Sequence, residues 1–365
     1  MHSLWRAFDA AAAATRKSLQ TQLDLKVLSA EMGAEYLATL PDASGGGGTF
    51  MPGFQSIGDD LLKVTQSTSF NWLVVVADAQ RAAFEASAVV AAQLEDPGGG
   101  LAAQAATDGI REYNSSTGQF HPAARAPLYV VRWVTLPSDD PTARVNFLQN
   151  VYSDPVRRPN LERVLVTNQT VMTPLLPGLL KDVTANQTPP SSIVYAPAWV
   201  YADSSYGTSQ TTAGNGMGRA ICGNGFHWTA VLSQSVPQSI SSALVVLQDP
   251  GNVTRTFVWN GYAATDGGAG DRSAQMLPRR LQRRSHTFTS RATGIEWRVT
   301  LYPTTALERQ FVSTAPRNTA LAVIAASLAC VLLFGCVARS ARVRAELIPL
   351  RRAASTSSSC GGARS

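Results

Sequence analysis

The feature that most constrains this chain is an uninterrupted apolar run over residues 319–338. Its twenty residues, TALAVIAASLACVLLFGCVA, contain no charged side chain, and Arg339 ends the run. A helix of this length spans about 30 Å, the thickness of the hydrocarbon core of a bilayer. The alternative is a helix buried in a large core, but such helices rarely stay apolar over so many residues. We therefore predict a transmembrane helix over 319–338.

The charges that follow this run predict its orientation. Residues 339–365 hold six Arg and one acidic residue, so they carry +5 of the formal net charge of +6. By the positive-inside rule we predict a basic, disordered cytoplasmic tail over 339–365. The residues before 319 are then extracytoplasmic, at the plasma membrane. Because these residues are nearly neutral, the pI of about 9.3 does not indicate a nucleic-acid partner.

The extracytoplasmic part is long enough for one large or two smaller domains. Its single cysteine, Cys222, cannot form an intrachain disulfide there, so packing must stabilise the fold. Four Asn-x-Ser/Thr sequons also lie in this part, and we expect them to be glycosylated if the protein is made in a eukaryote. They are at Asn114, Asn168, Asn186 and Asn252.

Residues 1–54 are predicted to form a stalk helix that ends at Pro41, followed by a Gly-rich loop. Apolar side chains recur in this helix at spacings of three and four: Leu19, Leu23, Leu25, Val27, Leu28, Met32, Tyr36, Leu37 and Leu40. This stripe predicts a parallel homodimer through the helix, with packing against the chain's own domain as the alternative. No signal peptide is recognisable, so we expect a membrane helix upstream or translocation of the whole N-terminal part.

The next segment carries the most specific motif. Residues 70–76 are predicted to form a strand, and a helix is predicted to begin at Arg81. The spacing of Trp72, Val76, Arg81, Phe84 and Glu85 resembles that of the CHASE domain, the extracytoplasmic sensor of cytokinin receptors, of histidine kinases and of nucleotide cyclases. Residue 74 is Val, where the family usually has Pro.

Four later segments extend the resemblance. Residues 128–134 form a β-rich run similar to the family's YxPVxY strand, with Tyr129, Val131 and Trp133 on one face. Residues 153–163, SDPVRRPNLER, look like the family's SDPxRRxxLERA turn, which enters a helix. Before this turn the family has Gly-x-Asp, whereas this chain has Leu148-Gln149-Asn150. Residues 173–176 and 193–197 are similar to the two strands that close the family's ligand pocket.

The fold that the resemblance implies is α+β. It has a long N-terminal helix and two PAS-like lobes, each an antiparallel sheet flanked by helices, followed here by the transmembrane helix. The CHASE-like domain then covers 55–310, with a distal lobe over about 55–200 and a membrane-proximal lobe over about 201–310.

The resemblance also implies a ligand site, and it marks a second set of residues as structural. The implied ligand-binding residues are Tyr129, Val131, Trp133, Arg157, Thr173, Leu179 and Tyr195. The implied structural residues are Trp72, Arg81, Phe84, Glu85, Asp154, Pro155, Arg158 and Pro197.

Arg157 is the informative departure from the family. Cytokinin receptors have an acidic residue at this position, where it contacts the ring nitrogens of the ligand. A cation cannot accept those hydrogen bonds, so we expect adenine-type cytokinins to bind poorly and an anionic or carbonyl-bearing ligand to be favoured. The alternative is that Arg157 is an exposed residue at a helix start, paired with Asp154.

The sequence contains no recognisable catalytic motif. The four His residues, at 2, 121, 227 and 286, are far apart, so no metal site and no cofactor are expected. There is no nucleophile elbow or P-loop. We therefore predict a membrane-anchored sensor of a small molecule, not an enzyme, as a fragment of a histidine kinase or nucleotide cyclase. The alternatives are an ectoenzyme tethered by its C-terminal helix and a surface binding protein without an effector.

Overall fold

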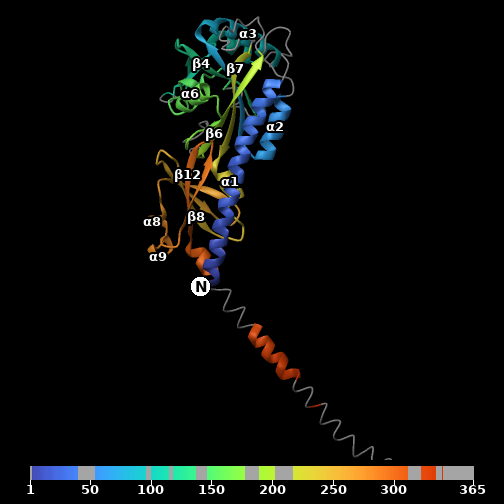
Figure 1. The fold of residues 1–365 in the computed structure, drawn as a ribbon, viewed down its shortest axis with the longest axis vertical. Helices are drawn as coiled ribbons and strands as arrows, with labels where there is room; N and C mark the ends of the chain where they lie inside the picture. Colours follow the sequence, from blue (N-terminus) through green and yellow to red (C-terminus); the bar gives the residue numbers. More distant parts are fainter. Residues whose placement is uncertain are drawn as a thin grey trace, which may run out of the picture. The chain divides into compact units, whose positions relative to one another are not determined.

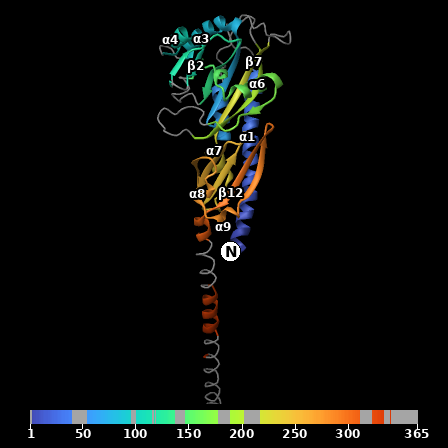
Figure 2. The same ribbon diagram turned by 90° about the vertical axis from the view of Figure 1, so that its left-hand side faces the viewer.

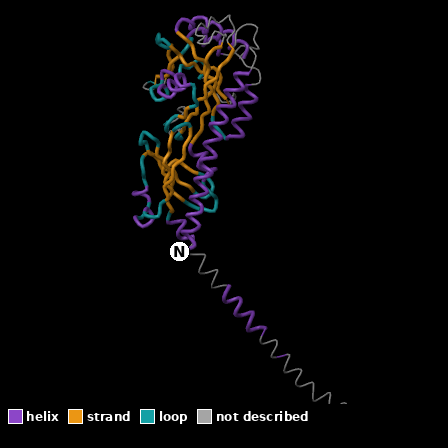
Figure 3. The backbone as a smooth tube through the Cα atoms, in the orientation of Figure 1, coloured by secondary structure: helices purple, strands orange, loops and turns teal. Residues whose placement is uncertain are grey.

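The computed structural model describes residues 2–39, 54–95, 100–114, 117, 119–136, 146–176, 189–201, 217–310, 322–333 and 339. The chain divides into a large unit, Trp5–Leu307, and a second unit made of Met1–Leu4 and Glu308–Ser365. Nearly all described elements belong to the large unit. It contains one long helix and two five-stranded antiparallel sheets, which Figures 1 and 3 show.

Helix α1 (His2–Thr39) is the longest element of the chain, with 38 residues. It is rich in Ala, a strong helix former, and contains no Pro. Its buried side chains recur every three or four residues and define one face: Phe8, Ala11, Ala12, Thr15, Leu19, Leu23, Lys26, Ala30 and Ala34. In both views α1 runs beside the two sheets of the large unit, and this face packs against them (Figures 1 and 2).

The first sheet forms the core of the distal lobe and has the strand order β4-β1-β7-β6-β5. Its strands are β1 (Ser69–Ala77), β4 (Leu128–Leu136), β5 (Val171–Met172), β6 (Ser191–Tyr201) and β7 (Met217–His227). Helices α1 and α2 (Phe54–Thr65) lie on one side of this sheet, and α6 (Arg158–Thr167) lies on the other side (Figure 1). The sheet is therefore covered on both faces.

The remaining helices and strands of the distal lobe are short. They are η1 (Asp78–Gln80), α3 (Arg81–Glu95), α4 (Gly100–Asp108), the hairpin of β2 (Arg111–Asn114) and β3 (Gln119–Pro122), and η2 (Val151–Ser153). The segment before η2 continues the sheet, because the amide of Arg132 donates to the carbonyl of Gln149 at 2.8 Å.

The second sheet forms the core of the proximal lobe, with the order β10-β9-β8-β12-β11. Its elements are α7 (Trp228–Ser235), β8 (Ala243–Gln248), β9 (Thr254–Trp259), β10 (Ala264–Ala269), α8 (Ser273–Met276), α9 (Arg279–Gln282), β11 (His286–Ala292) and β12 (Ile295–Pro303). Three fully buried tryptophans, Trp228, Trp259 and Trp297, belong to its core. The rings of Trp228 and Trp297 are in contact, with their centroids 4.6 Å apart.

Most of the predicted elements are confirmed. The N-terminal helix, the two antiparallel sheets, the strands around residues 70–76 and 193–197 and the helix after the SDPVRR turn are all present. Helix α4 ends at Asp108, and Tyr113 lies in strand β2. Residues 173–175 are not a strand, because the short strand β5 ends at Met172.

The predicted transmembrane helix over 319–338 is contradicted. In this region the described helix covers 322–333, which is 12 residues. In the part of the chain that the structure describes, no helix is both long enough and apolar enough to cross a membrane.

The structure also changes the argument about the stalk helix. Leu19 and Leu23 of the predicted apolar stripe are fully buried, and they pack within the chain's own large unit. Leu28 and Met32 lie on the outer side, each 50% exposed. Because the centre of the stripe is already covered, it does not require a partner chain. Dimerisation through α1 stays a prediction.

Gly33 allows α1 to approach the distal sheet closely. A Cβ atom on Gly33 would lie 2.7 Å from Cε1 of Phe70 and 2.9 Å from Sγ of Cys222. Real Cβ atoms do not approach neighbours so closely, so any side chain at residue 33 would push α1 and β1 apart. Cys222, the predicted lone thiol, is fully buried at this contact, and burial raises the pKa of its thiol.

We expect Gly33→Ala to lower the free energy of unfolding by about 1–3 kcal/mol, the usual cost of overpacking a core. The control is Gly100→Ala in α4, where a Cβ atom would meet nothing within 4 Å. That substitution should leave stability unchanged or slightly raised. Urea unfolding of both variants checks the prediction, and equal stability of the two would contradict it.

Lys26 also connects α1 to the distal lobe, and its side chain is fully buried. Its Nζ donates to the carbonyl oxygen of Thr65, the last residue of α2, and lies 3.3 Å from Oγ of Ser67. An ammonium group at a helix C-terminus is favourable, because carbonyl groups without helical partners point there. Burial lowers the pKa of Lys26 from 10.5 to about 8.

This lowered pKa predicts a pH dependence of stability. Between about pH 8 and 10.5 the unfolded chain binds more protons at Lys26 than the folded chain, so stability should rise with pH across this window. Relative to Lys26→Met, the wild type should gain on the order of 3 kcal/mol. Urea unfolding from pH 7 to 10 measures this difference, with the exposed Lys17→Met as control. Parallel pH profiles of wild type and Lys26→Met would contradict the prediction.

Candidate functional site

Strand β4 carries three of the seven predicted ligand-binding residues, and its two faces differ. Tyr129 and Val131 alternate with Val130 and Arg132, so the two pairs point to opposite faces of the distal sheet. All four side chains are buried. The contacts of each face therefore decide which residues can serve a ligand.

The hydroxyl of Tyr129 is already occupied by protein partners. It accepts from the amide of Ala126 at 2.8 Å and from Nη1 of Arg81 at 3.2 Å, and it donates to Oδ1 of Asp78 at 3.1 Å. The Arg81 guanidinium also lies over the Tyr129 ring, 5.1 Å from its centroid. The remaining bonds of Arg81 are with Glu85 at 2.8 Å and with the carbonyl of Ala123 at 3.0 Å.

Trp133 packs in an aromatic cluster at the same end of the lobe. Its ring lies 5.2 Å from that of Phe84 in α3 and 5.3 Å from that of Phe147, measured between centroids. Glu85 accepts from the amide of Ile110 at 2.9 Å, which joins α3 to the segment before β2. The family-motif residues Arg81, Phe84 and Glu85 thus hold α3 against β4.

On the opposite face of β4, Arg132 lies among a different set of residues. Arg132 is 5% exposed and Arg157 is 6% exposed. The pKa values of Arg132 and Tyr195 both respond to the charges of Arg157 and Asp154, so these four groups form one electrostatic cluster, which we call the arginine cluster. Around it lies an apolar core formed by Leu73, Val130, Val151, Leu161, Val164, Val171, Leu176, Ile193 and Ile221.

The carboxylate of Asp154, the acidic member of the arginine cluster, contacts two partners. Nε of Arg157 forms an ion pair with Oδ2 of Asp154 at 3.0 Å, and Oδ1 of Asp154 accepts from the amide of Val156 at 2.9 Å. The predicted Asp154–Arg157 pair is therefore present, but Arg157 is buried instead of exposed. Asp154 closes the turn before α6, and its side chain is 34% exposed.

Arg132 lacks a comparable partner. Among the described residues, its Nε is buried without any hydrogen bond, and no carboxylate forms an ion pair with it. Burial, together with the neighbouring Arg157, lowers the pKa of Arg132 to about 9, so the guanidinium stays charged at neutral pH. Burial raises the pKa of Tyr195, which keeps the phenol neutral. The cluster thus holds two positive charges and one negative charge.

The other predicted residues do not belong to the arginine cluster. Thr173 is fully buried, and its hydroxyl accepts from the amide of Ile193 at 2.9 Å. Arg158 is exposed and stacks on the ring of Tyr152 at 5.2 Å. Pro197 lies half-buried in β6, and Trp72 is buried in β1. Leu179 and Asn186 lie outside the described residues.

Sequence reasoning missed Arg132. The prediction placed Tyr129, Val131 and Trp133 on the ligand-binding face of strand β4. It did not consider the residues between them, which point to the other face. The available signal was a single charged residue inside the otherwise apolar run of 128–134. A charge is seldom fully buried unless it is paired or functional.

The Leu148-Gln149-Asn150 segment, where the resemblance expected Gly-x-Asp, forms a turn held by Asn150. Leu148 has a φ of 61°, a left-handed conformation that favours glycine. The side-chain oxygen of Asn150 accepts from the amides of Val130 at 3.1 Å and Tyr152 at 3.2 Å. The side-chain nitrogen of Asn150 donates to Oε1 of Glu112 at 3.1 Å, a bond that an aspartate could not make.

A serine–histidine contact bears on the ectoenzyme alternative. Oγ of Ser191 lies 2.7 Å from Nδ1 of His227 and 2.9 Å from the carbonyl oxygen of Pro189. Ser191 is fully buried, so a substrate cannot reach its hydroxyl. Burial also lowers the pKa of His227. The pair joins the paired ends of β6 and β7 and does not have the accessibility of a nucleophile.

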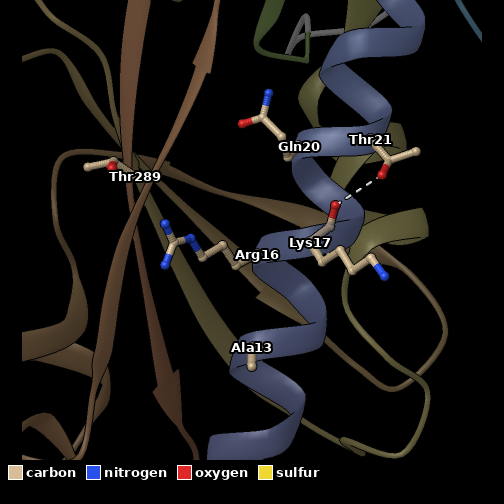
Figure 4. A pocket seen from close by; sticks show the side chains of 6 residues that line it. All are labelled: Ala13, Arg16, Lys17, Gln20, Thr21 and Thr289. Atoms are coloured by element: carbon tan, nitrogen blue, oxygen red, sulfur yellow. Dashed lines mark hydrogen bonds between the residues drawn. The ribbon is translucent and has the colours of Figure 1, made fainter.

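Two hollows lie on the surface of the proximal lobe. One, of about 340 Å³, lies between α1 and β11 and is lined by Arg16, Lys17, Gln20 and Thr289 among others (Figure 4). The other, of about 480 Å³, lies on the sheet and includes Gln248, Asp271 and Arg298. Charged and polar side chains line both hollows, whereas apolar side chains surround the arginine cluster.

A protein-family comparison gives one match. The family model described as CHASE domain matches residues 54–247, which cover the whole distal lobe and part of the proximal lobe. No curated protein sequence matches the chain.

Several solved structures resemble the chain at low identity. The periplasmic sensory domain of the Campylobacter jejuni chemoreceptor Tlp1 is 9% identical, with a TM-score of 0.40 over 82% of this chain and 94% of that one. The Campylobacter jejuni Tlp3 ligand-binding domain in complex with L-norvaline is 8% identical, with a TM-score of 0.34 over 83% and 93%. At these TM-scores the similarities do not bear on the ligand of this chain.

Proposed function

Because the chain belongs to the CHASE domain family, we propose that it is an extracytoplasmic sensor domain that binds a small molecule at the arginine cluster of the distal lobe. The observation that carries this proposal is the convergence of Arg132, Arg157 and Tyr195, from three separate elements, inside an apolar core. Apolar walls with a few convergent polar groups are typical of small-molecule sites.

The output of such a sensor is a change in α1. Strand β7 connects the proposed site with this helix, because alternate residues of β7 face opposite sides. Ile221 belongs to the apolar core around the arginine cluster, and Gly223 lies against the ring of Tyr195. Asn224 instead donates to the carbonyl of Lys26 in α1 at 3.1 Å. We infer that a ligand acts through β7 on α1, and that a histidine kinase or nucleotide cyclase domain receives the signal.

The first prediction concerns ligand class. In thermal-shift measurements on the full chain, N6-substituted adenines should not raise Tm, because Arg157 only donates hydrogen bonds. A ligand with an anionic or carbonyl group at a hundred times its Kd should add about 2.7 kcal/mol of stability. Arg157→Ala and Tyr195→Ala should abolish that gain, whereas the exposed Arg158→Ala should not.

The opposite pattern would contradict the proposed site. Stabilisation by adenine-type cytokinins that survives both Arg157→Ala and Tyr195→Ala would place ligand binding elsewhere in the chain.

A second prediction tests the extracytoplasmic location. Asn168 and Asn252 are exposed, whereas Asn114 is half-buried and its side chain accepts from the amide of Thr117. In a eukaryotic host we expect glycans on Asn168 and Asn252. Glycosidase should reduce the apparent mass, and Asn168→Gln with Asn252→Gln should remove most of that change. Asn160→Gln, which lies outside any sequon, is the control. A band that glycosidase does not shift would contradict the location.

A further inference from the structure

The arginine cluster carries a charge imbalance that indicates the chemistry of its ligand. Arg132 and Arg157 each bring a positive charge, and Asp154 brings the single negative charge. Asp154 is already engaged with Arg157 and with the amide of Val156. Among the described residues, nothing offers a second carboxylate to Arg132. Among the residues that the structure describes, one positive charge of the arginine cluster is therefore left without a compensating carboxylate.

The position of Arg132 makes this imbalance unfavourable without a ligand. The side chain lies next to Leu73 and Val130, in a sheet face that is otherwise apolar. A buried charge without a partner destabilises a fold by several kcal/mol. A guanidinium also presents its donors as a planar fork, which matches the two oxygens of a carboxylate. Nε, one donor of that fork, is the atom without a hydrogen bond.

From this geometry we propose that the ligand is a small molecule with a single carboxylate on an apolar body, and that Arg132 is the residue that binds the carboxylate. The inference rests on the proposed function and narrows it. One carboxylate neutralises the cluster, whereas a dianion such as phosphate would leave an excess negative charge. The apolar body is required because the surrounding side chains, such as Leu176, Ile193 and Ile221, offer no polar group beyond the cluster.

The test uses matched pairs of probes that differ only in this charge. They are 4-methylpentanoate with 4-methylpentanamide, phenylacetate with phenylacetamide, and leucine with leucinamide. Thermal shift and calorimetry on the full chain should show binding of at least one carboxylate and about 10- to 100-fold weaker binding of its amide. Equal binding of an amide and its carboxylate, or a panel in which no carboxylate binds, would overturn the proposal.

Variants of Arg132 separate ligand binding from a structural role. Arg132→Met should abolish carboxylate binding and should raise Tm of the ligand-free chain by about 2 °C or more, because it removes an unpaired buried charge. Arg132→Lys keeps the charge without the fork, so it should bind the carboxylate about 10-fold more weakly. The control is Arg163→Met, at an exposed position of α6. It should change neither property.

The outcomes separate the carboxylate inference from the proposed sensor function. A fall in Tm for Arg132→Met would show that Arg132 is already paired, and carboxylate binding that persists in this variant would remove its assigned role. Either result overturns the carboxylate inference. If a neutral compound then binds and Tyr195→Ala abolishes its binding, the proposed sensor function stands. If no compound of any class binds the chain, both fail.

Discussion

The structure depends on the packing of a single helix against two sheets. In both lobes, one face of the sheet packs against α1. The helix can serve both because its buried face is lined mainly by small residues, such as Ala11, Ala30 and Gly33, which allow close approach. Where a long side chain enters this interface, as at Lys26, its polar end reaches the C-terminus of α2. A shift of the distal sheet therefore acts directly on α1.

Much of this architecture could be predicted from the sequence, because it rests on local patterns. The Trp72 to Glu85 spacing and the SDPVRR turn each identify a strand or a helix start, and both are present. The orientation of α1 was not predictable in the same way. Its buried face combines alanines with larger residues such as Leu19 and Leu23, whereas Leu28 and Met32 of the same predicted stripe lie half-exposed. Hydropathy also predicted a membrane helix over 319–338, whereas no helix among the described residues is long and apolar enough to cross a membrane.

The candidate site was predicted in part, and the missing part follows from strand periodicity. A strand has two faces, and the sequence does not say which one meets the ligand when both are buried. Choosing the aromatic face of β4 selected Tyr129, whose hydroxyl is fully engaged with Arg81, Asp78 and Ala126. The departure from the family at Arg157 stays a prediction. The burial of Arg157 and its relation to Arg132 depend on contacts between segments far apart in the chain, which no local pattern encodes.

The uncompensated charge also bears on how a sensor of this kind responds. A ligand shifts an equilibrium only by the difference between its affinities for the two states. A cluster that is already neutral would gain little from an anion, whereas a buried cluster with one excess positive charge gains the full interaction. That gain arises on the sheet face next to Ile221 and Gly223, and the neighbouring residues of β7 contact α1. In the proposed sensor, this gain provides the free energy for a conformational signal in α1.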